Sequence, residues 1–235
     1  MALNALPAPD EKRAVIRSMF DRIAPRYDRM NRLLTAGLDQ RWRREALEQI
    51  RVGPGDRVID LAAGTGDLAE LAAARGARVV AIDFAGEMLR GAQRRGVDAG
   101  LVQADGESLP LRNGVASAAV CGFALRNFVS LPHIFAELAR VLEPGGRIAL
   151  IEVDRPTAPL IRQGHALYFD RLVPFVGGLL SDRTAYSYLP QSTAYLPPVE
   201  ELLAMLAAAG FFAAARQTRL LGAVQILTGV KRIAP

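Results

Sequence analysis

Residues 58–67 of this 235-residue chain read Val58-Ile59-Asp60-Leu61-Ala62-Ala63-Gly64-Thr65-Gly66-Asp67, and this stretch decides the fold. Its first half is a short apolar run after Gly53-Pro54-Gly55, which is typical of a buried strand. The two glycines let the backbone turn tightly against a ligand, and the helix that follows begins with free N–H groups. The stretch therefore predicts a strand, a ligand-binding turn and a helix.

Strands and helices of similar length alternate after this turn. The predicted helices are an Ala- and Leu-rich segment that ends near Arg75, then Gly86–Arg95 and Leu131–Leu142. The predicted strands are Arg57–Ala62, Arg78–Ile82, Gly100–Gln103, Ser117–Gly122 and, after the turn Pro144-Gly145-Gly146, Arg147–Val153. This alternation indicates crossover units, so we expect an α/β protein with a mostly parallel sheet and helices on both faces.

The segment before this core has a different pattern. Apolar residues at helical spacing predict a helix over Glu11–Ile23, which Pro25 interrupts. We predict a turn over Asn31–Gly37 and then a helix over Asp39–Ile50, with Asp39 as its N-cap.

The segment after the core, residues 154–198, is dense in Pro, Gly and aromatic residues, with one helix expected around Gln163–Val173. A stretch this long outside a sheet is typical of a cover over a site. A helix over Glu200–Ala209 and strands over Phe211–Thr218 and Gln225–Val230 complete the pattern. We expect a single domain with an N-terminal helical cover (1–50), a cofactor-binding core (51–153), a cover insertion (154–198) and a closing part (199–235).

Charge and cysteine content limit the setting and the partners. The formal net charge is +5, and many cations lie near the N-terminus: Lys12, Arg13, Arg17, Arg22, Arg26, Arg29, Arg32, Arg41, Arg43 and Arg44. A basic face attracts nucleic acid, anionic lipid or an anionic ligand, and a solvated surface is the plain alternative. Cys121 is the only cysteine, which excludes an intramolecular disulfide, favours a reducing cytoplasm and suits a core residue. Met1–Asp10 lacks the pattern of a signal peptide, and no apolar run approaches the roughly 20 residues of a membrane span.

Polar residues at the ends of the first three strands indicate the ligand. Gly64-x-Gly66-x-x-Ala69 with Asp83 also satisfies the dinucleotide-binding fingerprint, so a nicotinamide-dependent reductase stays open on this signal alone. Asp60 lies inside the strand before the glycines, where it suits a cationic ligand better than a pyrophosphate. Asp83 ends the second strand in position for ribose hydroxyls, and the polar loop Gln103–Pro110 follows the third strand. The structural alternatives are a carboxylate of Asp60 that caps backbone N–H groups, and ordinary turn residues at Asp83 and Asp105.

In order and spacing these three segments resemble the class I S-adenosylmethionine methyltransferases. Three further segments are similar to the family that C-methylates ubiquinone and menaquinone precursors: Met19–Asn31, Gly122-Phe123-Ala124-Leu125-Arg126-Asn127, and Asp182–Ser192 followed by Pro197–Leu202. The resemblance extends from about residue 12 to about residue 210. It implies a Rossmann-like methyltransferase fold and S-adenosyl-L-methionine as the cofactor. The candidate cofactor residues are Asp60, Gly64, Thr65, Gly66, Asp83, Asp105, Gly106 and Gly122.

The resemblance also implies methyl transfer to a ring carbon of a reduced isoprenoid quinol, and it favours the naphthoquinol precursor of menaquinone over a benzoquinol precursor of ubiquinone. Such chemistry needs orientation, a dry pocket and a way to share a hydroxyl proton. The candidate catalytic residues are Arg126, to stabilise a phenolate, Asn127, to orient it, and Tyr27, Tyr186 and Tyr188, to close over the ring. A structural ion pair is the alternative role of Arg126, and packing is the alternative role of the tyrosines.

Several further expectations concern partners. We expect no metal, since no Cys, His and Asp cluster has metal-ligand spacing, and we expect His133 at the surface. A methyltransferase for another small acceptor and a nucleic-acid-binding module are alternatives, but no base-reading motif is visible, so we expect no nucleic acid partner. Because isoprenoid quinols reside in the bilayer, we expect the basic N-terminal helix and residues 154–198 to meet a membrane surface peripherally. The sequence leaves homo-oligomerisation open.

Overall fold

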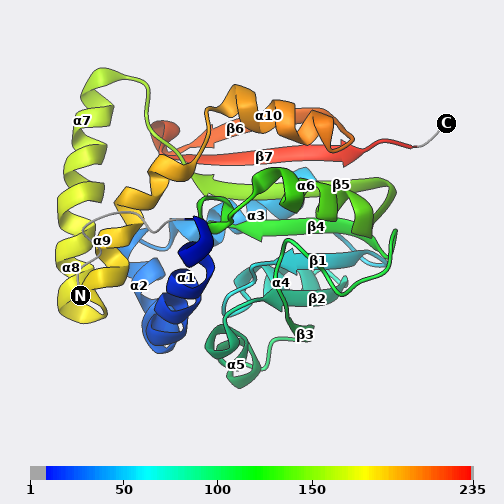
Figure 1. Ribbon diagram of the computed structural model, residues 1–235, viewed down its shortest axis with the longest axis horizontal. Coiled ribbons are helices and arrows are strands. Elements are labelled where there is room, and N and C mark those ends of the chain that lie inside the picture. The colour runs from blue at the N-terminus through cyan, green and yellow to red at the C-terminus, as the bar shows by residue number, and fades with distance from the viewer. Residues whose placement is uncertain (1–8, 234–235) are drawn as a thin grey trace.

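The computed structural model describes residues 9–233, so most of Met1–Asp10, where no signal peptide is expected, lies outside the described residues. The described chain builds a seven-stranded sheet with the order β3-β2-β1-β4-β5-β7-β6 (Figure 1). Its strands are β1 (Arg57–Leu61), β2 (Arg78–Asp83), β3 (Gly100–Gln103), β4 (Ala116–Gly122), β5 (Leu142–Val153), β6 (Phe211–Arg219) and β7 (Val224–Lys231). Neighbours from β3 to β5 pair in parallel, whereas β7 runs antiparallel to β5 and β6. The predicted α/β class with a mostly parallel sheet is confirmed.

The chain changes its direction of travel across the sheet between β1 and β4. It winds outward from β1 through β2 to β3 and then returns to place β4 beside β1. At such a switch point the connections after two neighbouring strands leave toward opposite faces, which opens a crevice at their carboxyl ends. The glycine turn after β1 and Gly122 at the end of β4 both lie at this crevice.

Helices cover both faces of the sheet and form its two cores. They are α3 (Leu38–Gln49) and α4 (Asp67–Ala73) on one face, α6 (Leu131–Val141) and α10 (Val199–Ala208) on the other, and α5 (Gly86–Arg94) beside β3. Trp42 and Leu68 belong to the first core, and Phe135 and Leu206 belong to the second. Cys121 is buried in the second core, as predicted.

A third layer, which we call the cover, lies at the carboxyl ends of the parallel strands (Figure 1). It consists of α1 (Pro9–Ile23), a 3-10 turn (Ala24–Arg26), α2 (Tyr27–Leu34), α7 (Pro159–Leu167), a π-helical turn (Tyr168–Leu172), α8 (Val173–Leu180) and α9 (Arg183–Ser192). Its apolar side chains form a separate cluster around Ile16, Met19 and Tyr186, joined by Met88 of α5. Segments far apart in sequence thus close over the same edge of the sheet.

Three local predictions are wrong. The turn expected over Asn31–Gly37 is shorter, because α2 continues to Leu34. The N-cap of α3 is Gly37, whose φ of +77° favours glycine, while Asp39 lies buried as the second residue of the helix. Residues 154–198 contain three α-helices in place of the single helix predicted. Of these helices, α8 contacts α2 and α9 contacts α1, and the local sequence pattern does not report such contacts.

Candidate active site

Two cavities lie side by side at the carboxyl ends of the parallel strands. The turn cavity, of about 60 Å³, follows the glycine turn and the ends of β2 and β4. The cover cavity, of about 390 Å³, lies beneath the helices of the cover. The same four residues line both: Phe20, Tyr27, Phe123 and Asn127. The two cavities therefore meet at these residues, which we call the junction, and groups bound in each can come into contact there.

Five of the eight predicted cofactor residues line the turn cavity: Gly64, Asp83, Asp105, Gly106 and Gly122. Asp83 is buried at the end of β2, and its two carboxylate oxygens accept the backbone N–H groups of Gly64 (2.7 Å) and Ala85 (2.8 Å). A carboxylate oxygen can accept more than one hydrogen bond, so Asp83 can also accept from the hydroxyls of a vicinal diol. Burial raises the pKa of Asp83 to about 6, so it is ionised near neutral pH.

Two of the glycines in this set lie where a side chain would collide. A Cβ atom at Gly106 would stand 3.0 Å from Cδ1 of Leu61. A Cβ atom at Gly122 would stand 2.8 Å from Nη1 of Arg43. Glycine at these positions lets a ligand or a neighbouring side chain approach the backbone closely. The packing of Leu61 and Arg43 therefore requires glycine at these two positions, and the carboxylate of Asp83 is the feature of the turn cavity that suits a vicinal diol.

The residues directly after β1 and β4 adopt strained backbone conformations. Ala62 has a φ of +53° and Phe123 has a φ of +61°, a region that residues with a Cβ atom rarely adopt. Such strain persists only where the surrounding structure fixes it, and it concentrates at functional sites. Both strained residues line the turn cavity, and Phe123 also belongs to the junction.

Asp60, Thr65 and Gly66 do not line the turn cavity. Asp60 is buried in β1, where its Oδ2 accepts the N–H of Ala69 at 2.8 Å, so the capping role that the sequence left open is present. Burial raises the pKa of Asp60 to about 7. The hydroxyl of Thr65 donates to Asp28 in a short contact, and Gly66 forms the N-cap of α4. These residues shape the turn, and their direct contact with a cofactor stays a prediction.

The N-terminal segment forms the roof of the turn cavity. Phe20 and Tyr27 contact each other edge to face, with ring centroids 6.1 Å apart. Arg13 also lines the cavity and pairs with Asp105 (3.1 Å) and Glu107 (2.7 Å). Pockets for small organic ligands usually enclose about 300–1,000 Å³. The turn cavity encloses only about 60 Å³, so a nucleoside can enter it only when the roof shifts. Part of the basic charge near the N-terminus thus serves internal ion pairs.

Aromatic and apolar side chains dominate the lining of the cover cavity. Tyr186 and Tyr188 reach it from α9, and Oη of Tyr188 donates to Oδ1 of Asn127 at 3.4 Å. Burial raises the pKa of both tyrosines, so their hydroxyls remain protonated near neutral pH. The structure therefore brings the predicted residues Tyr27, Asn127, Tyr186 and Tyr188 around one space, where the tyrosines can donate hydrogen bonds.

Arg126 lines the same cavity, but groups of the protein engage its charge. Its Nη1 pairs with Glu152 in a short contact and donates to the carbonyl oxygen of Phe123 at 2.9 Å. Its Nε donates to Oγ of Ser192 at 3.1 Å. Glu152 is fully buried on β5. The structural ion pair, which the sequence left open as an alternative, is therefore present, and an action of Arg126 on a ligand stays a prediction.

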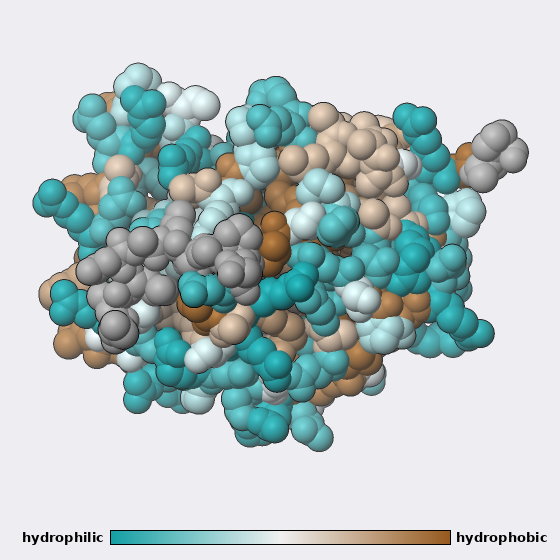
Figure 2. Space-filling model, in the orientation of Figure 1, coloured by the Kyte–Doolittle hydropathy of each residue, from teal (hydrophilic) through white to brown (hydrophobic). Residues whose placement is uncertain are grey.

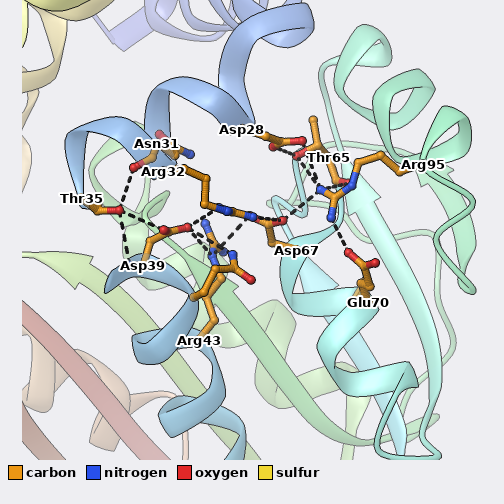
Figure 3. A network of polar contacts seen from close by, with 12 residues as sticks. Asp28, Asn31, Arg32, Thr35, Asp39, Arg43, Thr65, Asp67, Glu70 and Arg95 are labelled. Carbon is orange, nitrogen blue, oxygen red and sulfur yellow. Dashed lines mark hydrogen bonds and ion pairs between the residues drawn. The ribbon is translucent and has the colours of Figure 1, made fainter. Parts of the chain in front are cut away.

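A network of three arginines beside the site was not predicted (Figure 3). Arg32 of α2 donates to both Asp39 and Asp67, and Arg95, at the end of α5, donates to Asp67 at 2.9 Å. Arg43 of α3 lies between the same two carboxylates. Because Asp67 begins α4, the network ties the N-terminal segment to the glycine turn. The arginine-rich composition was the available signal, but it did not identify the distant partners.

The two histidines differ in position. His165 of α7 lines the cover cavity, although neither histidine was predicted as a site residue. Its ring stacks on Phe169 with centroids 5.2 Å apart, and burial lowers the pKa of His165 below its usual value. His133 is exposed near the start of α6, as predicted. Within residues 9–233, no three side chains of the His, Cys, Asp and Glu types come together in a way that could hold a metal ion.

Comparison with known proteins decides the family. The model of the ubiE/COQ5 methyltransferase family matches residues 8–231. The chain belongs to this family. Among ubiE/COQ5 relatives, a demethylmenaquinone methyltransferase of Thermus thermophilus is 44% identical over 82% of this chain and 91% of its own. A demethylmenaquinone methyltransferase of Roseiflexus sp. is 40% identical over 99% of this chain and 100% of its own. A ubiquinone/menaquinone biosynthesis C-methyltransferase UbiE of Syntrophotalea carbinolica is 42% identical over 83% of this chain and 85% of its own.

Solved structures agree with the fold expected of a ubiE/COQ5 protein. A SAM-dependent methyltransferase from Aquifex aeolicus superimposes with a TM-score of 0.61 at 15% identity, covering 86% of this chain and 97% of its own. At this identity the likeness concerns the fold alone. The class I methyltransferase fold predicted from the glycine turn and the strand-end aspartates is confirmed, and so is the resemblance to the family carried by the flanking motifs.

Proposed function

We propose that this protein transfers the methyl group of S-adenosyl-L-methionine to a ring carbon of reduced demethylmenaquinone, a step of menaquinone biosynthesis. The junction of the two cavities carries the proposal, because it joins the turn cavity, where Asp83 can accept the hydroxyls of an adenosine once the roof shifts, to a larger apolar space. Family membership supports methyl transfer, and relatives from Thermus thermophilus and Roseiflexus sp. carry this acceptor in their names.

S-adenosyl-L-methionine supplies an electrophilic methyl group on a cationic sulfur. The quinol loses a hydroxyl proton, and the phenolate raises the electron density of the adjacent unsubstituted carbon. That carbon forms the new C–C bond while the electron pair of the C–S bond stays on sulfur. The methylated carbon then loses its hydrogen as a proton, which restores the aromatic quinol. An oxidised quinone lacks this nucleophilic carbon, so the reduced acceptor is required.

The residues of the chain bind, orient and exclude water. Asp83 would accept hydrogen bonds from the ribose hydroxyls, and Gly106 and Gly122 line the cavity in which we place the adenosine. At the junction, Tyr27 and Asn127 would orient the acceptor ring toward the methyl group. The apolar lining keeps water away, which strengthens the attraction between phenolate and sulfonium as their charges neutralise.

Methyl transfer to a defined acceptor tests the proposal. The purified protein is incubated with labelled S-adenosyl-L-methionine and short-chain demethylmenaquinol, with and without a reductant, beside a benzoquinol of matched chain length. We expect label in the naphthoquinone product only under reducing conditions. Transfer to the benzoquinol alone would show that a benzoquinol, and not demethylmenaquinol, is the acceptor. Binding of NADH without binding of S-adenosylhomocysteine would refute methyl transfer altogether.

We also propose that the cover contacts a bilayer peripherally, since isoprenoid quinols reside there. In the part of the chain from 9 to 233, every helix is too short or too polar to traverse a bilayer. Phe175 and Leu179 of α8 are 71% and 76% exposed, and apolar surface is visible at the left edge of Figure 2, over α8. Exposed apolar patches of this kind are typical of interaction surfaces. Arg13 and Arg22 of α1 already pair with carboxylates of the protein, Glu107 and Asp182, so we place the contact on α8 rather than on α1.

Vesicle flotation tests this contact. We expect the protein to float with anionic vesicles, and the double substitution Phe175→Ser and Leu179→Ser to abolish flotation. Phe212→Ser is the matched control, because Phe212 is also an exposed phenylalanine (44%) but lies on β6. Equal flotation of the α8 variant and the control would refute the assignment to α8.

A further inference from the structure

The guanidinium of Arg43 is buried beside the junction without a hydrogen-bond acceptor. Arg43 is 5% exposed and lines the cover cavity. Among residues 9–233 no group accepts a hydrogen bond from its side chain, and its Nε is completely buried. A guanidinium offers five N–H donors, and buried polar groups are almost always hydrogen-bonded, so such an exception calls for a physical reason.

Two carboxylates hold Arg43 by charge and leave its donors free. Its Nε lies 3.7 Å from Oδ2 of Asp39 and 3.6 Å from Oδ2 of Asp67, beyond the length of a hydrogen bond. The oxygens of both carboxylates already accept hydrogen bonds from other side chains: Arg32, Thr35, Gln40 and Arg95. Arg95 pairs with Asp28 and Glu70 as well, so the network joins three arginines to four carboxylates (Figure 3), and among these arginines only Arg43 makes no hydrogen bond to a carboxylate.

Close contacts place Arg43 between the two cavities. Its Nη1 lies so near the end of β4 that a Cβ atom at Gly122 would stand 2.8 Å away. Its Cζ lies 5.4 Å from the ring centroid of Phe123, a residue of the junction. Its charge also lowers the pKa of Tyr27 in part, although burial raises that pKa overall. A ligand at the junction therefore comes within reach of the free donors.

We propose that Arg43 is the oxyanion-binding residue of this site, with its free N–H donors directed at a negatively charged oxygen of a ligand at the junction. Under the proposed function, on which this inference rests, two oxyanions belong there: the phenolate oxygen of the quinol and the carboxylate of the methionine part of the cofactor. The other arginine of the cavity, Arg126, uses its donors on Glu152, Phe123 and Ser192. These bonds use Nε and Nη1 of Arg126, whereas no N–H group of the Arg43 side chain is hydrogen-bonded within residues 9–233, so Arg43 has more donors to offer.

Three variants test the role of Arg43. Arg43→Gln removes the charge, and Arg43→Lys keeps it on a smaller head group. Arg41→Gln is the matched control, since Arg41 lies on the same helix with a 71% exposed side chain that pairs with Glu45. The titratable and charged groups that face Arg43 stay unchanged in all three: Tyr27, Arg32, Asp39, Asp60, Asp67 and Cys121. Thermal unfolding checks that each variant is folded.

The readouts separate the two oxyanions. The affinities for S-adenosylhomocysteine, which has the carboxylate, and for 5′-methylthioadenosine, which lacks it, are measured by calorimetry. The pKa of bound 1-naphthol is read from its phenolate absorbance, and methyl transfer to demethylmenaquinol is followed across pH. Loss of a hydrogen bond to a charged group corresponds to a change of about 10- to 100-fold in an affinity or a rate.

If the phenolate is bound, Arg43→Gln slows methyl transfer about 10- to 100-fold, raises the pKa of bound naphthol and leaves the affinity for S-adenosylhomocysteine unchanged. If the carboxylate is bound, Arg43→Gln lowers the affinity for S-adenosylhomocysteine by this factor and leaves the affinity for 5′-methylthioadenosine unchanged. In either case Arg43→Lys retains part of the effect of the wild-type residue, and Arg41→Gln behaves as the wild type.

Two results would overturn the inference. Arg43→Gln could leave every affinity, the naphthol pKa and the rate within about twofold of the wild type. It could also lower the affinities for both nucleosides equally and lower the unfolding temperature at the same time, which is the behaviour of a purely structural residue. If the wild-type protein itself fails to methylate the quinol, the proposed function fails, whereas the nucleoside and naphthol measurements still decide on Arg43.

Discussion

Substitution of Arg126 by methionine is expected to lower the free energy of unfolding by about 3–5 kcal/mol, because it leaves the buried carboxylate of Glu152 without its counter-ion. The side chain also loses its hydrogen bonds to Phe123 and Ser192. The backbone N–H groups of Arg126 and Val153 still donate to Glu152, which favours the lower half of this range. For a domain of this size each kcal/mol shifts Tm by about 2–4 °C, so we expect Tm to fall by roughly 6–20 °C.

The double variant Arg126→Met, Glu152→Gln isolates the charge. Glutamine can still accept the two backbone N–H groups, so we expect it to recover at least about 2 kcal/mol of the loss. Urea unfolding followed by circular dichroism gives the free energies of all four proteins in the cycle. A loss below about 1 kcal/mol in the single variant, or a coupling below about 0.5 kcal/mol, would refute the reasoning. Methyl transfer by the stable double variant then shows whether Arg126 acts on the acceptor or only holds Glu152.

Three further predictions concern the strand ends. With a pKa of about 6, Asp83 becomes protonated as the pH falls, so the affinity for S-adenosylhomocysteine should decline from pH 7.5 to pH 5; in Asp83→Asn calorimetry should find it weak and independent of pH. Because the pKa of Asp60 is about 7 in the folded protein against 3.8 as its ordinary value, the contribution of Asp60 to stability should be lost as the pH rises from about 4 to about 7, by at most about 4 kcal/mol. Asp60→Asn should show a smaller loss of stability between pH 5 and pH 8 in urea unfolding and keep only the part that Asp83 contributes, and a loss equal to that of the wild type would contradict the burial argument. Gly106→Ala should cost about 1–3 kcal/mol by crowding Leu61 and should weaken nucleoside binding, whereas Gly53→Ala, where nothing lies within 4 Å, should be close to neutral in both assays.

The strands and the turn between β1 and α4 were predictable because their signals are local. An apolar run of five or six residues predicts a buried strand, and Gly64 and Gly66 after it predict a tight turn. Both glycines do have positive φ. Asp83 was predictable for the same reason, since the carboxyl ends of parallel strands meet at one edge of the sheet.

The cover was not predictable to the same degree. Its helices pack their apolar sides on one another across long sequence separations, so residues 154–198 show only a weak local pattern. The N-cap at Gly37 was missed because a capping aspartate and an aspartate that serves a buried ion pair look the same in sequence. Likewise, Asp60 caps the backbone N–H of Ala69, the structural role that the sequence left open. The sequence could not decide for this role, because the N–H of Ala69 reaches Asp60 only once α4 has turned back on β1.

The sequence by itself determined the fold class, the glycine turn, the strand-end aspartates and the residues of the family motifs, because each depends on neighbours along the chain. The tertiary structure alone decided which of these face a cavity, that Arg126 is paired with Glu152, and that Arg43 keeps its donors free beside Gly122. A hydrogen-bond partner and a solvent-free space arise only when separate elements meet. For an arginine-rich segment, local sequence therefore fixes how many charges there are, and packing fixes which of them remain available to a ligand.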